Sequence, residues 1–182
     1  KGRAASMAHQ TSLKLDVSGF SNYALHQGFE LQRIFSFKAG IADEADLREV
    51  LGWQSPNYVR KVVCRPSMAV FRRKELVVEQ HFHYGQGIKN VPSDCYLTGY
   101  WQSEKNFLEI AAQIRKDFTF KLPMGGKNIE LAKRVSEVTA VSLHVRRGDY
   151  VNNPETTAIH GACTLEYYQA AIKYIAERIE QP

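Results

Sequence analysis

Residues 138–150, V-T-A-V-S-L-H-V-R-R-G-D-Y, decide how the rest of the chain is interpreted. Apolar residues at positions 138, 141, 143 and 145, with a β-branched threonine among them, predict a short buried strand. The apolar run then gives way to His144, two arginines, a glycine, an aspartate and a tyrosine. Because open α/β sheets bind ligands at the carboxyl ends of their strands, these residues predict a ligand site.

The two arginines give this site its expected chemistry. Arg146 and Arg147 carry planar, always charged donors that match the geometry of phosphate or carboxylate. Gly148 allows a sharp turn or a close approach to a ligand, and Asp149 could brace one guanidinium. A solvated basic turn is the alternative for an isolated Arg-Arg pair, and the tripeptide 147–149 also spells an integrin-binding motif, but chance explains a three-residue match.

Three stretches together resemble a known family, the α-1,2-fucosyltransferases of glycosyltransferase family 11. They are H-V-R-R-G-D-Y at residues 144–150, Y-L-T-G-Y-W-Q-S-E-K-N-F at 96–107, and I-H-G-A-C-T-L-E-Y-Y at 159–168. The H-x-R-R-G-D core also occurs in α-1,6 and protein O-fucosyltransferases, so the G-Y-W-Q-S-E-K block carries the finer likeness. The family's glycine-rich G-G-L-G-N-Q loop is not found, and we expect a bacterial chain truncated at both ends.

The resemblance implies an activity and a fold. The family moves L-fucose from GDP-fucose to the 2-hydroxyl of a galactoside, with inversion and with no required metal or other cofactor. The implied fold class is α/β, in incomplete Rossmann-like layers of a GT-B type glycosyltransferase. Residues 1–137 would be the acceptor-side domain and residues 138–182 the start of the donor-binding domain. A non-catalytic nucleotide- or glycan-binding homologue and a fucosyltransferase of another linkage remain alternatives.

The resemblance also assigns roles to single residues. Arg146 would neutralise the departing β-phosphate, and Arg147 would contact the other phosphate or brace the loop. Asp149 and His160 are candidates for the base that removes the acceptor proton. The departing phosphate or a residue elsewhere could also serve as that base. The residues assigned to substrate binding are His144, Arg146, Arg147, Gly148, Tyr150 and His160.

Composition limits the other classes of function. The net charge is +5 but the basic residues are dispersed, which disfavours a nucleic-acid module. No apolar run is long enough to span a bilayer. We expect a cytoplasmic protein or a peripheral contact with the bacterial cytoplasmic membrane, or the Golgi lumen if the source is eukaryotic. The three cysteines have no C-x-x-C spacing, which predicts free, mostly buried thiols. The partners expected are a sugar nucleotide and a glycan acceptor, and the oligomeric state stays open.

Local patterns predict alternating strands and helices, and hence a mostly parallel α/β architecture. Strands are expected at residues 13–17, 76–82 and 96–100, in addition to the one at 138–145. Helices are expected after the capping residues Asp43, Ser103 and Thr164, and around residues 129–135.

Several aromatic and histidine residues have two interpretations. Trp53, Tyr100 and Trp101 could stack on sugars or bases, but packing in the core is favoured. His81 and His83 would share one face of a strand and could form half of a metal site. A structural role is favoured because no partner motif accompanies them.

Two polar groups are explained most simply by local structure. Asp16 and Ser18 could face the acceptor, but turn chemistry alone accounts for them. Arg60, Lys61 and Arg65 are interpreted as a solvated basic face.

Overall fold

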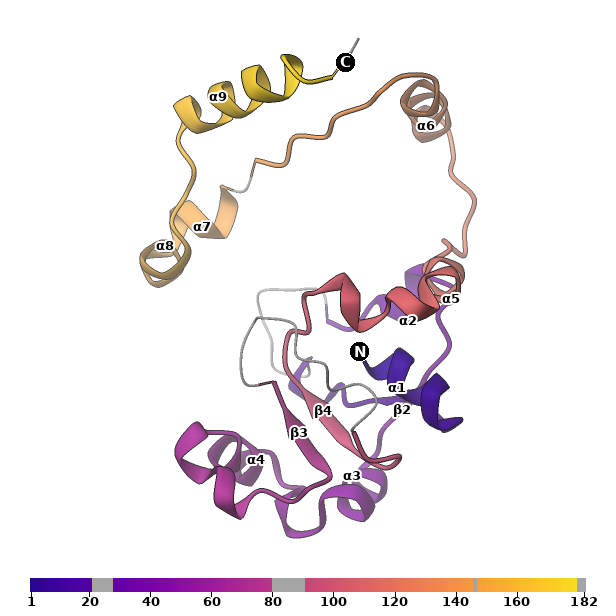
Figure 1. Cartoon of the computed structure of the whole chain (residues 1–182), viewed down its shortest axis with the longest axis vertical. Coiled ribbons are helices and arrows are strands. Elements are labelled where there is room, and N and C mark those ends of the chain that lie inside the picture. Colours follow the sequence, from indigo (N-terminus) through magenta and orange to yellow (C-terminus); the bar gives the residue numbers. More distant parts are fainter. Residues whose placement is uncertain (21–27, 80–90, 146, 180–182) are drawn as a thin grey trace. The chain divides into compact units, whose positions relative to one another are not determined.

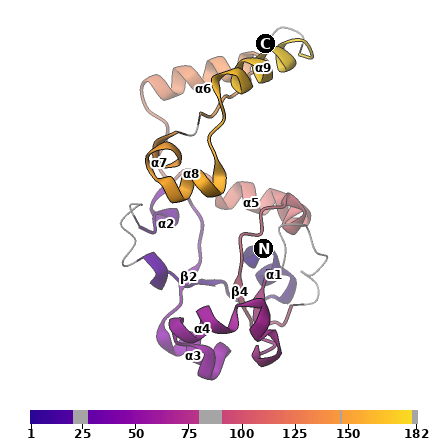
Figure 2. The same cartoon turned by 90° about the vertical axis from the view of Figure 1, so that its left-hand side faces the viewer.

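The computed structural model describes residues 1–20, 28–79, 91–145 and 147–179 of the 182-residue chain. The chain forms two compact units, Lys1–Leu122 and Pro123–Pro182, drawn in Figures 1 and 2 from indigo to pink and from orange to yellow. The predicted division at residue 137 concerns which substrate each part binds, and it stays a prediction.

The first unit mixes short strands with helical segments. Its strands are β1 Lys14–Leu15, β2 Gly40–Ile41, β3 Leu76–Val78 and β4 Tyr96–Thr98. Its α-helices are α1 Gly2–His9, α2 Leu31–Ile34, α3 Glu44–Leu51, α4 Asn57–Val63 and α5 Ala111–Asp117. Its 3₁₀ segments are η1 Ser18–Phe20, η2 Gly52–Gln54, η3 Pro66–Phe71, η4 Glu104–Asn106 and η5 Leu108–Ile110.

The described strands form two parallel pairs. β1 pairs with β2, and β3 pairs with β4, with Leu76 opposite Tyr96 and Val78 opposite Thr98. Figure 1 shows β3 and β4 running side by side. The strands predicted at 13–17, 76–82 and 96–100 are therefore confirmed over shorter ranges, and residues 80–82 of the second lie outside the described residues. The mixed α/β class is confirmed in this coarse form, and the two-domain GT-B arrangement stays a prediction.

Local capping signals place two helices correctly. Asp43 accepts a hydrogen bond from the Asp46 backbone N–H at 2.9 Å, the Asp46 carboxylate bonds back to the Asp43 N–H, and Gly52 ends α3. In the second unit, Thr164 accepts from the Tyr167 N–H and begins α9, Leu165–Ala176. The structure ends this helix at Ala176, and just beyond it the Arg178 guanidinium donates to the Tyr174 carbonyl at 2.9 Å.

The helix predicted after Ser103 is wrong as one continuous element. Ser103 does cap, accepting from the Lys105 N–H at 3.4 Å, but the segment it begins is only η4. Phe107 then adopts φ −144° and ψ 9°, which is not helical, and the chain continues through η5 into α5. The apolar spacing thus identified a helical region, and the backbone break at Phe107 divides it.

The core of the first unit lies between α3, α4 and β3. Leu51, Val63 and Leu76 are buried and pack together, with Val59 and Tyr96 against them. A separate aromatic cluster joins distant parts of the unit. Its members are Phe35, Phe37, Phe118 and Phe120, with Phe35 5.0 Å from Phe120 and 5.2 Å from Phe118 between ring centroids.

The buried strand predicted at residues 138–145 is not formed. The second unit contains α6 Lys127–Glu137, α7 Gly148–Asn152, α8 Pro154–His160 and α9, and its described residues include no strand. Val138, Val141, Leu143 and Val145 are 48–60% exposed. A β-strand needs a partner for its backbone groups, and nothing in the described part of this unit supplies one.

Candidate functional site

The residue with the central predicted role, Arg146, lies outside the described residues. Asp149 and Tyr150 belong to α7, and His160 ends α8. The side chains of these three residues also lie outside the described part of the structure. Their assignments to catalysis and substrate binding stay predictions.

The described residues of the motif face solvent. His144 and Arg147 are exposed, and Gly148 begins α7. A Cβ added at Gly148 would meet no atom within 4 Å, so the described fold leaves open space there. Strand alternation would place His144 and Arg146 on one side, but the described residues 138–145 form no strand.

A second candidate feature lies at the carboxyl ends of β3 and β4. Glu79 follows β3, and its backbone N–H donates to the Thr98 carbonyl at 2.9 Å. Its carboxylate accepts from the Tyr100 N–H at 2.6 Å and from the Trp101 N–H at 3.0 Å. The half-buried Glu79 carboxylate thus fixes the turn after β4, at the sheet edge where ligands commonly bind in parallel sheets.

The backbone of this turn is strained. Trp101 has φ 50°, a left-handed conformation that bulky residues rarely adopt and that costs on the order of 1–3 kcal/mol. The hydrogen bonds that the Tyr100 and Trp101 N–H groups donate to Glu79 offset this cost. Just downstream, the Asn106 amide donates to the Ser103 carbonyl at 3.0 Å. Strain held in place by surrounding contacts is common at functional sites, which marks this turn as a candidate.

We expect Gly99→Ala to destabilise the first unit by about 2 kcal/mol, because the added methyl group would displace the Glu79 side chain from the N–H groups that it binds. A Cβ at Gly99 would lie 2.3 Å from the Glu79 Cβ and 2.8 Å from Glu79 Oε2. The measurement is the urea midpoint. Gly19→Ala is the matched control, since a Cβ at Gly19 would meet nothing within 4 Å. Equal midpoints for the two variants would contradict the proposed role of Glu79 in fixing this turn.

The core-packing interpretation of the aromatic residues is wrong for two of the three. Trp53 is 60% exposed and Tyr100 is 76% exposed, while Trp101 is half-buried. The Glu79 bonds hold Tyr100 at the sheet edge. His81 and His83 lie outside the described residues.

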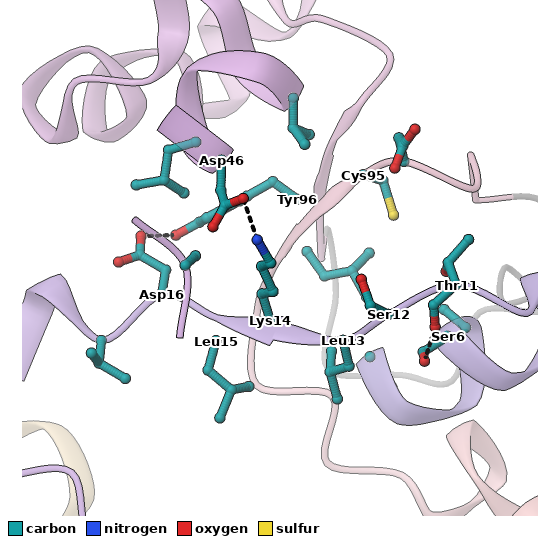
Figure 3. Close-up of a pocket in the computed structure, with 18 of the residues that line it drawn as sticks. Ser6, Thr11, Ser12, Leu13, Lys14, Leu15, Asp16, Asp46, Cys95 and Tyr96 are labelled. Carbon is teal, nitrogen blue, oxygen red and sulfur yellow. Dashed lines mark hydrogen bonds and ion pairs between the residues drawn. The ribbon is translucent and has the colours of Figure 1, made fainter. Parts of the chain in front are cut away.

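Beside β1 the first unit contains a cavity of about 600 Å³, shown in Figure 3. Hydroxyl, carboxylate, ammonium and phenol groups line it together with apolar side chains. Lys14 points toward Asp46 and forms an ion pair with it, and Tyr96 points toward Asp16 (Figure 3). The polar members labelled there are Ser6, Thr11, Ser12, Lys14, Asp16, Asp46 and Tyr96. A cavity of this size and mixed lining can hold a small polar ligand such as a sugar.

Asp16 is the centre of a buried polar network at this cavity. Its Oδ2 accepts from the Arg60 guanidinium at 3.0 Å and from the Tyr96 hydroxyl at 2.8 Å. Its Oδ1 accepts from the backbone N–H and the hydroxyl of Ser18, at 3.0 and 2.6 Å. Burial alone would raise the pKa of Asp16, but the bonds from Ser18, Tyr96 and Arg60 together lower it. Burial, followed by the bond to Asp16, raises the pKa of Tyr96 to about 12.

These contacts give Asp16 a structural role. A carboxylate that already accepts four hydrogen bonds and has a lowered pKa is a poor general base. The predicted turn chemistry is confirmed by the two Ser18 bonds, and the long-range bonds to Arg60 and Tyr96 were not foreseen.

The solvated face predicted for Arg60 is wrong, because its side chain is only 8% exposed. Lys61 and Arg65 are exposed, as predicted. Helical spacing could have predicted the burial of Arg60, because Arg60 lies on the inward side of α4 together with Val59 and Val63.

The cysteines are free, as predicted, and two are half-buried. Burial raises the pKa of Cys64 and Cys95, which disfavours their thiolate forms. Cys163 is exposed, and the prediction that it is buried is wrong. Within the described ranges, no group of three or more His, Cys, Asp or Glu side chains is placed to hold a metal ion.

Comparison with known proteins gives clear matches. The sequence model described as glycosyl transferase family 11 matches residues 78–182. An α-1,2-colitosyltransferase of Escherichia coli is 34% identical over 183 residues, covering 98% of this chain and 59% of that protein. An Escherichia coli O-antigen biosynthesis glycosyltransferase, WbnK, is 38% identical over 52 residues, 28% of this chain and 17% of its own length. No solved structure matches.

Proposed function

Because the chain belongs to glycosyl transferase family 11, we propose that it acts in an inverting transferase that moves L-fucose from GDP-fucose to the 2-hydroxyl of a terminal galactoside. The observation that carries this proposal is the likeness to an α-1,2-transferase over 98% of the chain. The chain spans 59% of that relative's length, and the proposal concerns the activity of the whole protein.

The proposed reaction needs a positive charge at the leaving group. Breaking the bond between fucose C1 and the diphosphate leaves negative charge on the β-phosphate. Arg146 would stabilise that charge without exchanging a proton, because a guanidinium stays protonated at all relevant pH values. Asp149 or His160 would accept the proton of the attacking hydroxyl.

The acceptor requires a surface that recognises a sugar ring. Pyranose rings present C–H groups on one face, and exposed aromatic side chains pack against such faces. Tyr100, 76% exposed and held by Glu79 at the carboxyl edge of β3 and β4, supports a role in acceptor binding. We assign it to the galactoside as part of this proposal.

A second donor is favoured by the name of one relative, the α-1,2-colitosyltransferase. Colitose is fucose without its 3-hydroxyl, so the two donors differ by a single polar group. A site that hydrogen-bonds the 3-hydroxyl discriminates strongly against colitose, whereas an apolar pocket at that position accepts colitose and rejects fucose only weakly.

A transfer assay separates these donors. We expect the protein, in the form that its cell makes, to transfer fucose from GDP-fucose to lactose at the galactose 2-hydroxyl. GDP-colitose and GDP-mannose are the comparison donors, and 2-deoxygalactosides are the control acceptors. Faster transfer from GDP-colitose would reassign the donor. Nucleotide binding without transfer from any donor would indicate the non-catalytic homologue, and product on another hydroxyl would overturn the linkage.

A further inference from the structure

Residues 52–74 form a stretch without a single acidic residue. The chain has 19 Asp and Glu in 182 residues, about one in ten, so their absence over this length is informative. The stretch contains Arg60, Lys61, Arg65, Arg72, Arg73 and Lys74. Arg60 forms a buried ion pair with Asp16. Arg72 donates to the carbonyls of Val63 and Cys64. Lys61, Arg65 and Lys74 are exposed.

Helix α4 divides these residues between two sides. Arg60 and Val63 are buried, with Val59 packed on the core. Tyr58 and Val62, spaced by four residues with Lys61 beside them, are 74% and 41% exposed. The outward side of α4 therefore combines apolar and basic groups, where an outward side in water is ordinarily polar.

The following segment adds further exposed apolar groups. Val70 and Phe71, in η3, are 84% and 60% exposed. The buried Gln54 amide fixes this segment, donating to the Phe71 carbonyl at 2.7 Å and accepting from the Arg73 N–H at 3.2 Å. Arg72 ties the same segment to the end of α4. These hydrogen bonds hold the segment that carries the exposed groups, and α4, which it follows in the chain, lies next to α3 at one end of the first unit in both views (Figures 1 and 2).

We propose that this basic–aromatic surface, made by Tyr58, Lys61, Val62, Arg65, Val70 and Phe71, binds the face of an anionic lipid bilayer. Lysine and arginine near such a face gain attraction from its negative potential, and aromatic and aliphatic side chains enter the boundary between headgroups and acyl chains. Residues 52–74 themselves contribute no acidic side chain that would repel such a face. The proposal is independent of the donor and acceptor assigned above.

A nucleic acid fits this surface less well. Phosphate backbones attract the basic residues, but they offer no apolar phase in which Val62 and Val70 could be buried. An acidic protein is the remaining class of binding partner for this surface. Both classes are distinguished from a bilayer by the measurement below.

The test is co-sedimentation of the protein with vesicles. We expect binding to vesicles of phosphatidylglycerol and phosphatidylcholine, and much weaker binding to phosphatidylcholine alone. Lys61→Gln with Arg65→Gln should weaken binding to the anionic vesicles about 30-fold, from the loss of two basic groups near the surface. Arg115→Gln with Lys116→Gln on α5 removes the same two residue types elsewhere in this unit, and it should leave binding within about twofold.

A second pair of variants tests the apolar part. Val70→Ser with Phe71→Ser should weaken binding at least about 30-fold, and the loss should persist in high salt, where the charge contribution is screened. Leu108→Ser with Leu122→Ser, also exposed, is the control. Circular dichroism checks that each variant is folded. Equal binding by test and control variants, or binding of anionic polymers such as heparin or DNA but not of vesicles, would overturn the proposal.

Discussion

Replacing Arg146 with alanine should lower the rate of glycosyl transfer about 10³-fold or more while the protein stays folded. In the proposed reaction, negative charge develops on the leaving diphosphate, and a single well-placed cation would be a major source of stabilisation for that charge. The measurement is kcat with saturating donor and acceptor, with circular dichroism and thermal unfolding as checks on the fold.

Arg147→Ala is the matched control, since it removes the same group one residue further along. We expect it to raise the KM for the donor about tenfold through weaker donor binding, and to leave kcat at saturating donor within a few-fold of the parent value. Arg146→Lys should recover only part of the activity, because an ammonium lacks the planar donors of a guanidinium. Near-normal turnover in Arg146→Ala, or the larger loss in Arg147→Ala, would show that the assigned role is wrong.

Structure set by neighbours in the sequence was largely predictable. The helix after Asp43 and the helix after Thr164 are specified by caps that act within three residues. Their side chains satisfy backbone groups that have no other partner at a helix start, so the signal is local and complete.

Structure that depends on distant partners was less predictable. The apolar pattern of residues 138–145 is that of a strand, but a strand forms only where another strand pairs with it, and none is described nearby. Phe107 gives the converse case, because the apolar spacing continues while the backbone leaves the helix.

The candidate sites likewise contain parts that the local sequence predicted and parts that depend on residues far apart in the chain. The sequence identified the motif at 144–150 and the G-Y-W-Q block, and the structure adds the carboxylate that fixes the second of these. Glu79 lies 21 residues before Tyr100, and no local pattern connects them. Glu79 lay inside the strand predicted at residues 76–82, and only the observed end of β3 at Val78 places it at the edge where parallel sheets present their functional groups.

Asp16→Ala should destabilise the first unit by about 3 kcal/mol, the largest stability effect that we expect from a single substitution here. Arg60 and Asp16 have side chains only 8% and 11% exposed, so removing the carboxylate leaves a buried guanidinium without its counter-charge. The Tyr96 hydroxyl and two groups of Ser18 lose their acceptor as well. The urea midpoint, at an unchanged slope, measures the loss.

A double-mutant cycle separates this cause from a general loss of packing. Arg60→Met alone should also destabilise, but Asp16→Ala with Arg60→Met should cost less than the sum of the two, because no unpaired charge remains. Tyr96→Phe removes one hydrogen bond and should cost only about 1 kcal/mol. Strict additivity of the Asp16 and Arg60 effects would exclude the pair as the source.

The pH dependence gives an independent check on the same network. The pKa of Asp16 in the folded state lies below its ordinary value of 3.8, so the charged carboxylate stabilises the fold fully above that value. That contribution is lost as the pH falls through the lower folded-state pKa. The difference in unfolding free energy between the parent protein and Asp16→Ala should therefore stay constant from about pH 5 to 8 and shrink below about pH 4. A difference that instead grew on acidification would mean that Asp16 is protonated in the fold, because burial would then outweigh the bonds from Ser18, Tyr96 and Arg60.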